Sequence, residues 1–73
     1  MKILTGSVTE IITLNEKINS GLKETVPGYE AESYSDVIIN GDTASLIIDE
    51  SDPRNPVQFL SEDEKNKLQN FEG

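Results

Sequence analysis

The side chains of this sequence that could do chemistry are mainly carboxylates, and half of these carboxylates lie in one stretch, residues 30–52. That stretch carries seven acids and no base, whereas the whole chain of 73 residues has a formal net charge of −8 at pH 7. The seven are Glu30, Glu32, Asp36, Asp42, Asp49, Glu50 and Asp52. Such a surface attracts basic partners and repels phosphates, so we expect no direct binding to nucleic acid.

The residue types that usually perform catalysis are missing from the sequence. It has no histidine and no cysteine, which removes the commonest general base, the thiolate nucleophile and the usual zinc ligands. No glycine-rich phosphate loop or nucleophile elbow occurs either. Two carboxylates can perform acid–base catalysis only in a cleft that raises one pKa, and a thin domain has little room for one. We therefore expect no enzymatic activity.

The stretch 49–52 crowds three carboxylates, which is the kind of oxygen-rich composition that hard cations favour. It lacks the alternating ligands, the central glycine and the closing glutamate of an EF-hand loop. We therefore expect no metal site, and no motif indicates a cofactor.

Length and composition indicate one small folded domain over residues 1–73. Leu, Ile, Val and Phe make up 20 of the 73 residues, enough for a thin core. The N-terminus has no signal-peptide pattern, and no apolar run approaches the ~18 residues of a membrane span. A soluble, cytoplasmic protein is the simplest expectation.

A first helix is expected within residues 7–25, ended by the Pro-Gly pair at 27–28. Ser7 with Glu10, or Thr13 with Glu16, has capping-box spacing, so the sequence allows two starts. The early start places two asparagines, at 15 and 19, near the middle of the apolar face. Because residues 8–13 are rich in β-branched side chains, a short hairpin before a helix from Thr13 is the competing interpretation.

Residues 33–49 are expected to form a β-hairpin. The Asn-Gly pair at 40–41 suits a two-residue type I′ turn between strands at 33–39 and 43–49. Any two-residue loop puts one set of apolar side chains on a single face, whereas a bulged loop of three or five residues breaks that parity. The set is Val37, Ile39, Ala44, Leu46 and Ile48.

The C-terminal third predicts a turn-rich connector at 52–56 and a second, short helix. Ser61 and Glu64 form a capping box at its start, and Leu60, Leu68 and Phe71 are the expected core contacts. The predicted fold is a small α+β domain of the order helix–β-hairpin–helix (αββα), with Ile3–Thr5 as an additional third strand.

The hairpin is the candidate binding site. Acids two residues apart on a strand lie about 6.6 Å apart, which is comparable with phosphate spacing along a nucleic-acid strand. The predicted partner-binding residues are Glu30, Glu32, Tyr34, Asp36, Ile38, Ile47, Asp49, Glu50 and Asp52. One competing interpretation is that the acids form a solvated face that only keeps the protein soluble. Another is that later segments cover Tyr34, Ile38 and Ile47.

Two functions from different classes follow from this surface. The first is a non-enzymatic protein-binding module that presents carboxylates to the basic groove of a nucleic-acid-binding protein, as small inhibitors or regulators from phages and mobile elements do. The second is a small structural protein that self-associates through the Tyr34–Ile38–Ile47 face or through a free edge of the hairpin. The acids favour the first, because a two-fold contact brings like charges together.

Overall fold

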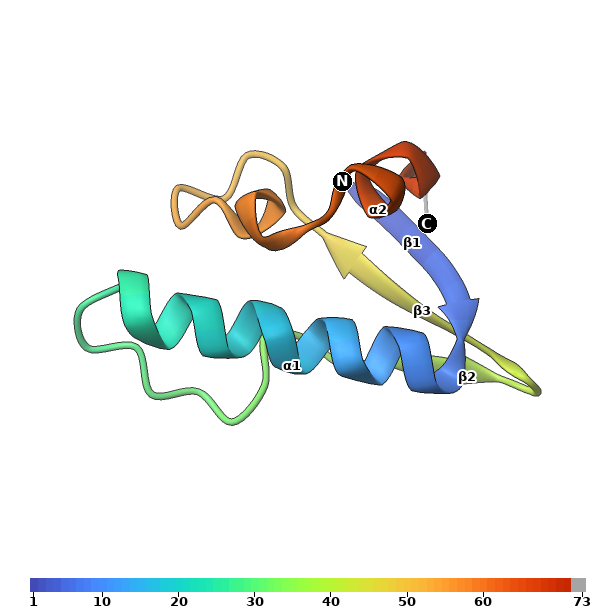
Figure 1. Cartoon of the computed structure of the whole chain (residues 1–73), viewed down its shortest axis with the longest axis horizontal. Helices are drawn as coiled ribbons and strands as arrows, with labels where there is room; N and C mark the ends of the chain where they lie inside the picture. Colours follow the sequence, from blue (N-terminus) through green and yellow to red (C-terminus); the bar gives the residue numbers. More distant parts are fainter. Residues whose placement is uncertain (72–73) are drawn as a thin grey trace.

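The computed structural model describes residues 1–71 and has the predicted α+β class (Figure 1). A four-stranded antiparallel sheet, in the order β2-β3-β1-β4, packs against one long helix and a short one. In chain order the elements are β1 (Lys2–Ser7), α1 (Val8–Thr25), β2 (Ile38–Asn40), β3 (Thr43–Ile48), the 3-10 helix η1 (Pro56–Phe59), α2 (Glu62–Lys67) and β4 (Gln69–Asn70).

The additional N-terminal strand is confirmed, and it lies in the centre of the sheet. β1 pairs with β3 on one side and with β4 on the other. The chain passes directly into α1 at Ser7, whose hydroxyl accepts a hydrogen bond from the backbone N–H of Glu10 at 3.2 Å. The early helix start is therefore the one that forms, and the competing N-terminal hairpin does not.

The core lies between one stripe of α1 and one face of the sheet. Ile11, Leu14, Ile18 and Leu22 are fully buried at helical spacing, which explains why the β-branched stretch adopts a helix here: burial outweighs its strand propensity. The sheet contributes Leu4, Ala44, Leu46 and Ile48 to the same cluster, and Leu60 completes it.

The turn of the hairpin is one residue later than predicted. Asn40 pairs with Thr43, so the two loop residues are Gly41 and Asp42. Of these two residues, Gly41 alone has a positive φ, of 63°. This is the sign pattern of a type II′ turn, whereas a type I′ turn needs a positive φ at both residues, so the predicted type I′ turn is wrong. On β3 the predicted residues face the core, because both two-residue loops, 40–41 and 41–42, put the same side chains on the same face. On β2, however, Ile39 is 59% exposed.

The first predicted strand, 33–39, is wrong for most of its length, because only Ile38–Asn40 is β-structure. Backbone groups of the segment before β2 form hydrogen bonds with side chains of α1 instead. Asn15 donates from Nδ2 to the carbonyl of Ser35 at 2.9 Å and accepts from its N–H at 3.2 Å. Residues 29–37 therefore run back beside α1 as an irregular segment (Figure 1).

A second asparagine, one helical turn further along α1, extends this attachment. Asn19 donates to the carbonyl of Ala31 at 3.2 Å and accepts a hydrogen bond from the hydroxyl of Tyr29 at 2.6 Å. Asn15 and Asn19 are the two buried polar side chains of the core region, and each has its partners. The apolar face of α1 thus tolerates them because they hold the segment 29–35.

The predicted second helix and the core contacts of Leu60 and Leu68 are confirmed, and one strand is added. Ser61 and Glu64 form both halves of the capping box of α2. Leu60 is buried and Leu68 packs against the core, while Phe71 is half-buried and donates its N–H to the carbonyl of Met1 at 3.1 Å. The sequence contained no signal for β4, which is only two residues long.

We expect Asn15→Ala to lower the free energy of unfolding by about 1–3 kcal/mol, because it removes two hydrogen bonds and leaves the N–H and C=O of Ser35 without those partners. The measurement is urea denaturation. Asn66→Ala is the matched control, since Asn66 is exposed on α2. Equal stability of the two variants would show that the attachment of residues 31–35 does not stabilise the fold.

Gly21→Ala should also destabilise, which reverses the usual effect of this change in a helix. Alanine is normally favoured there by about 0.5–1 kcal/mol, but a Cβ at position 21 would overlap the ring of Phe59. Overpacking of this kind costs about 1–3 kcal/mol. Thermal and urea unfolding should place Gly21→Ala below the wild type and the exposed control Ser20→Ala at or above it. A stabilised Gly21→Ala would mean that α1 and η1 do not pack this closely.

Candidate protein-interaction surface

The seven acids of residues 30–52 fall into two groups with different surroundings. The first group is exposed and makes no ion pair with any residue of the described range 1–71. It consists of Glu30, Glu32, Asp36 and Asp42. The predicted strand does not align them, because the first three lie on the irregular segment beside α1 and the last lies in the hairpin turn.

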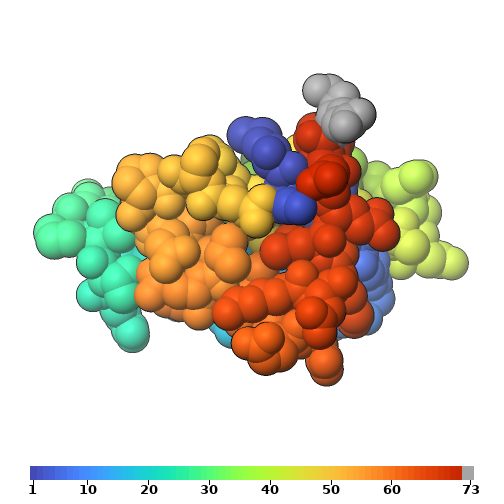
Figure 2. All heavy atoms as spheres, turned by 90° about the horizontal axis from the view of Figure 1, so that it is seen from above, coloured from blue at the N-terminus to red at the C-terminus, as the bar shows by residue number. Residues whose placement is uncertain are grey.

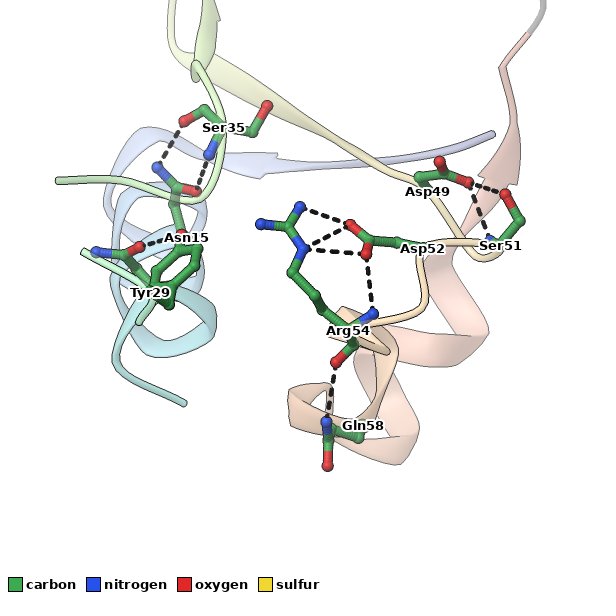
Figure 3. A network of polar contacts seen from close by, with 9 residues as sticks. Asn15, Tyr29, Ser35, Asp49, Ser51, Asp52, Arg54 and Gln58 are labelled. Carbon is green, nitrogen blue, oxygen red and sulfur yellow. Dashed lines mark hydrogen bonds and ion pairs between the residues drawn. The ribbon is translucent and has the colours of Figure 1, made fainter. Parts of the chain in front are cut away.

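The second group follows β3 and is held by local partners. Asp52 forms a forked ion pair with Arg54, in which Nη2 lies 2.7 Å from Oδ2 and Nε lies 3.0 Å from Oδ1 (Figure 3). The backbone N–H of Arg54 donates to Oδ1 as well, at 2.9 Å. These hydrogen bonds lower the pKa of Asp52 and raise the pKa of Arg54. Asp52 is only 12% exposed and its charge is matched, so it contributes little to an acidic surface.

Asp49 and Glu50 are also engaged. Asp49 accepts hydrogen bonds from the hydroxyl of Ser51 at 2.6 Å and from its backbone N–H at 3.0 Å, and these bonds lower the pKa of Asp49 (Figure 3). Glu50 lies 3.9 Å from the ammonium group of Lys2, which also donates to Asn70 at 2.7 Å. The acids at 49–52 therefore shape the turn that leaves the sheet.

Arg54 links this turn to the segment held by α1. Its guanidinium carbon lies 5.6 Å above the ring of Tyr29, within cation–π range. Tyr34 lies close enough for its hydroxyl to interact electrostatically with Arg54 and Asp52, and burial raises the pKa of that hydroxyl. Sequence reasoning assigned no role to Tyr29 or Arg54, since neither lies in a motif.

The structure does not bring Tyr34, Ile38 and Ile47 together as one exposed patch. Tyr34 is half-buried and packs against the core, as do Val57 and Phe59 of η1. Ile38 and Ile47 lie on the opposite face of the sheet, where Ile38 is 48% exposed and Ile47 half-buried.

Among the strand residues of the described range, those on this opposite face are all uncharged, and none of them is buried. Strand alternation and the pairing register assign it Ile3, Thr5, Ser7, Ile38, Asn40, Thr43, Ser45, Ile47 and Gln69. Thr5 and Ser45 share a hydrogen bond across it at 2.8 Å. It is a polar, uncharged surface with three isoleucines.

A shallow groove of about 380 Å³ lies between α1 and α2. It is lined by Thr9, Glu10, Thr13, Leu14, Lys17 and Glu64. Partial burial raises the pKa of Glu64, but hydrogen bonds from Ser61 and the ammonium of Lys17 at 3.4 Å outweigh that effect and lower it overall. A carboxylic acid catalyst needs the opposite shift of its pKa.

A metal site and a membrane-spanning helix are two further features to consider for residues 1–71. Within that range, no three carboxylates lie close enough together to hold a metal ion. None of the helices described there is long and apolar enough to cross a membrane.

Comparisons with protein-family models, with curated proteins and with solved structures find no match for this chain. The residues and their geometry are therefore the basis for assigning a role.

The pKa shifts at the 49–54 turn predict how stability changes with pH. Asp49 and Asp52 have lowered pKa values in the folded protein, so their stabilisation is present above the unfolded-state pKa of about 3.9 and is lost as the pH falls through the folded values. Asp52→Asn should lower the urea midpoint at about pH 7 and flatten its decline below about pH 4.

The matched control is Asp36→Asn, which changes the charge equally at an exposed carboxylate without an ion pair in the described range. It should follow the wild-type curve. If Asp52→Asn did so too, the fork with Arg54 would not contribute to stability.

Proposed function

We propose that this protein is a non-enzymatic binding module that presents carboxylates to a basic protein surface, with the groove of a nucleic-acid-binding protein as the partner class. The observation that carries the proposal is the composition of residues 30–42. Four exposed carboxylates without ion pairs in the described range accompany the two exposed isoleucines of β2. Apolar contacts bordered by unpaired charge are what a protein interface needs for affinity and for orientation.

The two halves of the acidic stretch contribute differently to this role. Acids at 49–52 are bound by Arg54, Ser51 and Lys2, so their charge is already partly matched. The acids at 30–42 keep theirs, and long-range attraction from them would speed the encounter with a cationic partner. Ile38 and Ile39 would then slow its release, because their exposed apolar area becomes buried.

We rank self-association behind this role. The face proposed for it loses Tyr34 to the core, which reduces its apolar area. Two copies would also bring two formal charges of −8 together. A basic partner turns the same charge into an attraction.

Affinity capture from lysate of the source cells tests the proposal with matched variants. The test variant replaces the free acids of residues 30–42: Glu30→Gln, Glu32→Gln, Asp36→Asn and Asp42→Asn. The control removes the same charge from the two helices: Glu10→Gln, Glu16→Gln, Glu24→Gln and Asp63→Asn.

The wild type and the control should capture a basic nucleic-acid-binding protein at about 50 mM salt and release it at about 500 mM, where the Debye length is only a few ångströms. The test variant should not capture it. Capture that ignores salt, or equal capture by both variants, would count against the proposal.

A further inference from the structure

β2 is an edge strand with an unpaired outer side. It is the first strand in the order β2-β3-β1-β4, so β3 is its neighbour on one side alone. Figures 1 and 2 both show the hairpin that carries it projecting from one end of the molecule. An exposed strand edge is a template on which another strand can pair.

The pairing register identifies which backbone groups are free. Asn40 and Thr43 close the two-residue turn and therefore form a hydrogen-bonded pair. Bonded and non-bonded pairs alternate in an antiparallel ladder, so Ile39 opposite Ala44 is non-bonded. The N–H and C=O of Ile39 consequently point away from β3, and outside the sheet ladder no backbone group of the described range hydrogen-bonds to them.

The side chains beside this edge are available too. Ile38 and Ile39 point to opposite faces and are 48% and 59% exposed. They are two of the four large apolar side chains that are exposed in residues 1–71. A strand added beside β2 would cover both side chains and would form hydrogen bonds with the N–H and C=O of Ile39.

Charge selects what kind of strand can be added. Asp36 and Asp42 lie three residues before and three residues after Ile39. Neither lies in β2, because Asp36 belongs to the irregular segment before the strand and Asp42 to the turn after it. If a second copy paired antiparallel about Ile39, the Asp36 of each copy would approach the Asp42 of the other at the two ends of the short ladder. Like charges brought close together repel, whereas basic residues at the two ends of an added strand would be attracted.

We infer that a basic, extended peptide segment pairs with the outer edge of β2, through both backbone groups of Ile39, with a basic residue at each of its ends near Asp36 and Asp42. This rests on the proposed function and adds the mode of binding. The two bases of the ligand lie six positions apart, as the two aspartates do in this chain. The residues between them alternate so that apolar ones cover Ile38.

The test uses the full chain and a defined peptide, acetyl-Lys-Thr-Val-Thr-Val-Thr-Lys-amide. Titration is followed by chemical shifts and hydrogen exchange of backbone amides. The peptide should bind below about 1 mM and slow exchange at the amide of Ile39. N-methylation of its central threonine removes the donor to the carbonyl of Ile39, and should weaken binding at least about tenfold.

Variants on the protein side provide the reciprocal test. Ile39→Pro removes the outward N–H without removing a bond to β3, so a folded variant should lose the peptide, while Ile39→Val should retain it. Asp36→Asn with Asp42→Asn should weaken binding severalfold more than Glu16→Gln with Glu24→Gln. If Ile39→Pro does not fold, the N-methylated peptide on the wild type still decides.

The outcomes separate the two proposals. Equal binding of the N-methylated peptide, unchanged exchange at Ile39, no binding at about 1 mM, or protection of Ile39 that depends on protein concentration without peptide would each overturn strand addition. The acidic binding module would survive them if capture from lysate still depended on salt and on the acids at 30–42. Failure of that capture would overturn the proposed function itself.

Discussion

The attachment of residues 29–35 to α1 is the constraint on which the rest of this structure depends. Two asparagines, at 15 and 19, lie one helical turn apart on the buried side of the helix, and both are satisfied by the returning chain. A buried amide without partners would cost several kcal/mol, so the helix and the segment require each other. This attachment determines where the chain leaves the helix and how little of it remains to pair with β3.

The acidic surface is a consequence of that attachment. If the whole segment 30–37 had joined the sheet, Glu30, Glu32 and Asp36 would have stood in a row on one of its faces. The asparagines instead hold the segment at the flank of α1, and the hairpin keeps only three residues of β2. The result is a short, free edge between two aspartates, together with an exposed acidic segment that is fixed in place.

A different set of contacts holds the turn that follows β3. Arg54 pairs with Asp52 and lies over Tyr29, so the turn after β3 is joined to the segment that α1 holds. This arrangement matches the charge of Asp52 with that of Arg54. The acids of residues 30–52 therefore divide into structural and free ones, and two of the free ones, Asp36 and Asp42, flank the unpaired backbone of Ile39 in the sequence. The binding role proposed for this protein draws on both features.

The sequence by itself determined the α+β class, a helix from Thr13 onward, the short second helix with its cap, the position of β3 and the charge asymmetry, whereas it left the start of the first helix open. These are local properties: capping-box spacing, apolar periodicity and composition act within a few residues. It also placed Asn15 and Asn19 on the apolar face, but their partners lie 10 to 20 residues away. Tertiary structure alone decided the shortened β2, the turn at Gly41–Asp42, the burial of Tyr34 and the strand β4. Each of these depends on contacts between distant segments, whose free energy no local pattern encodes.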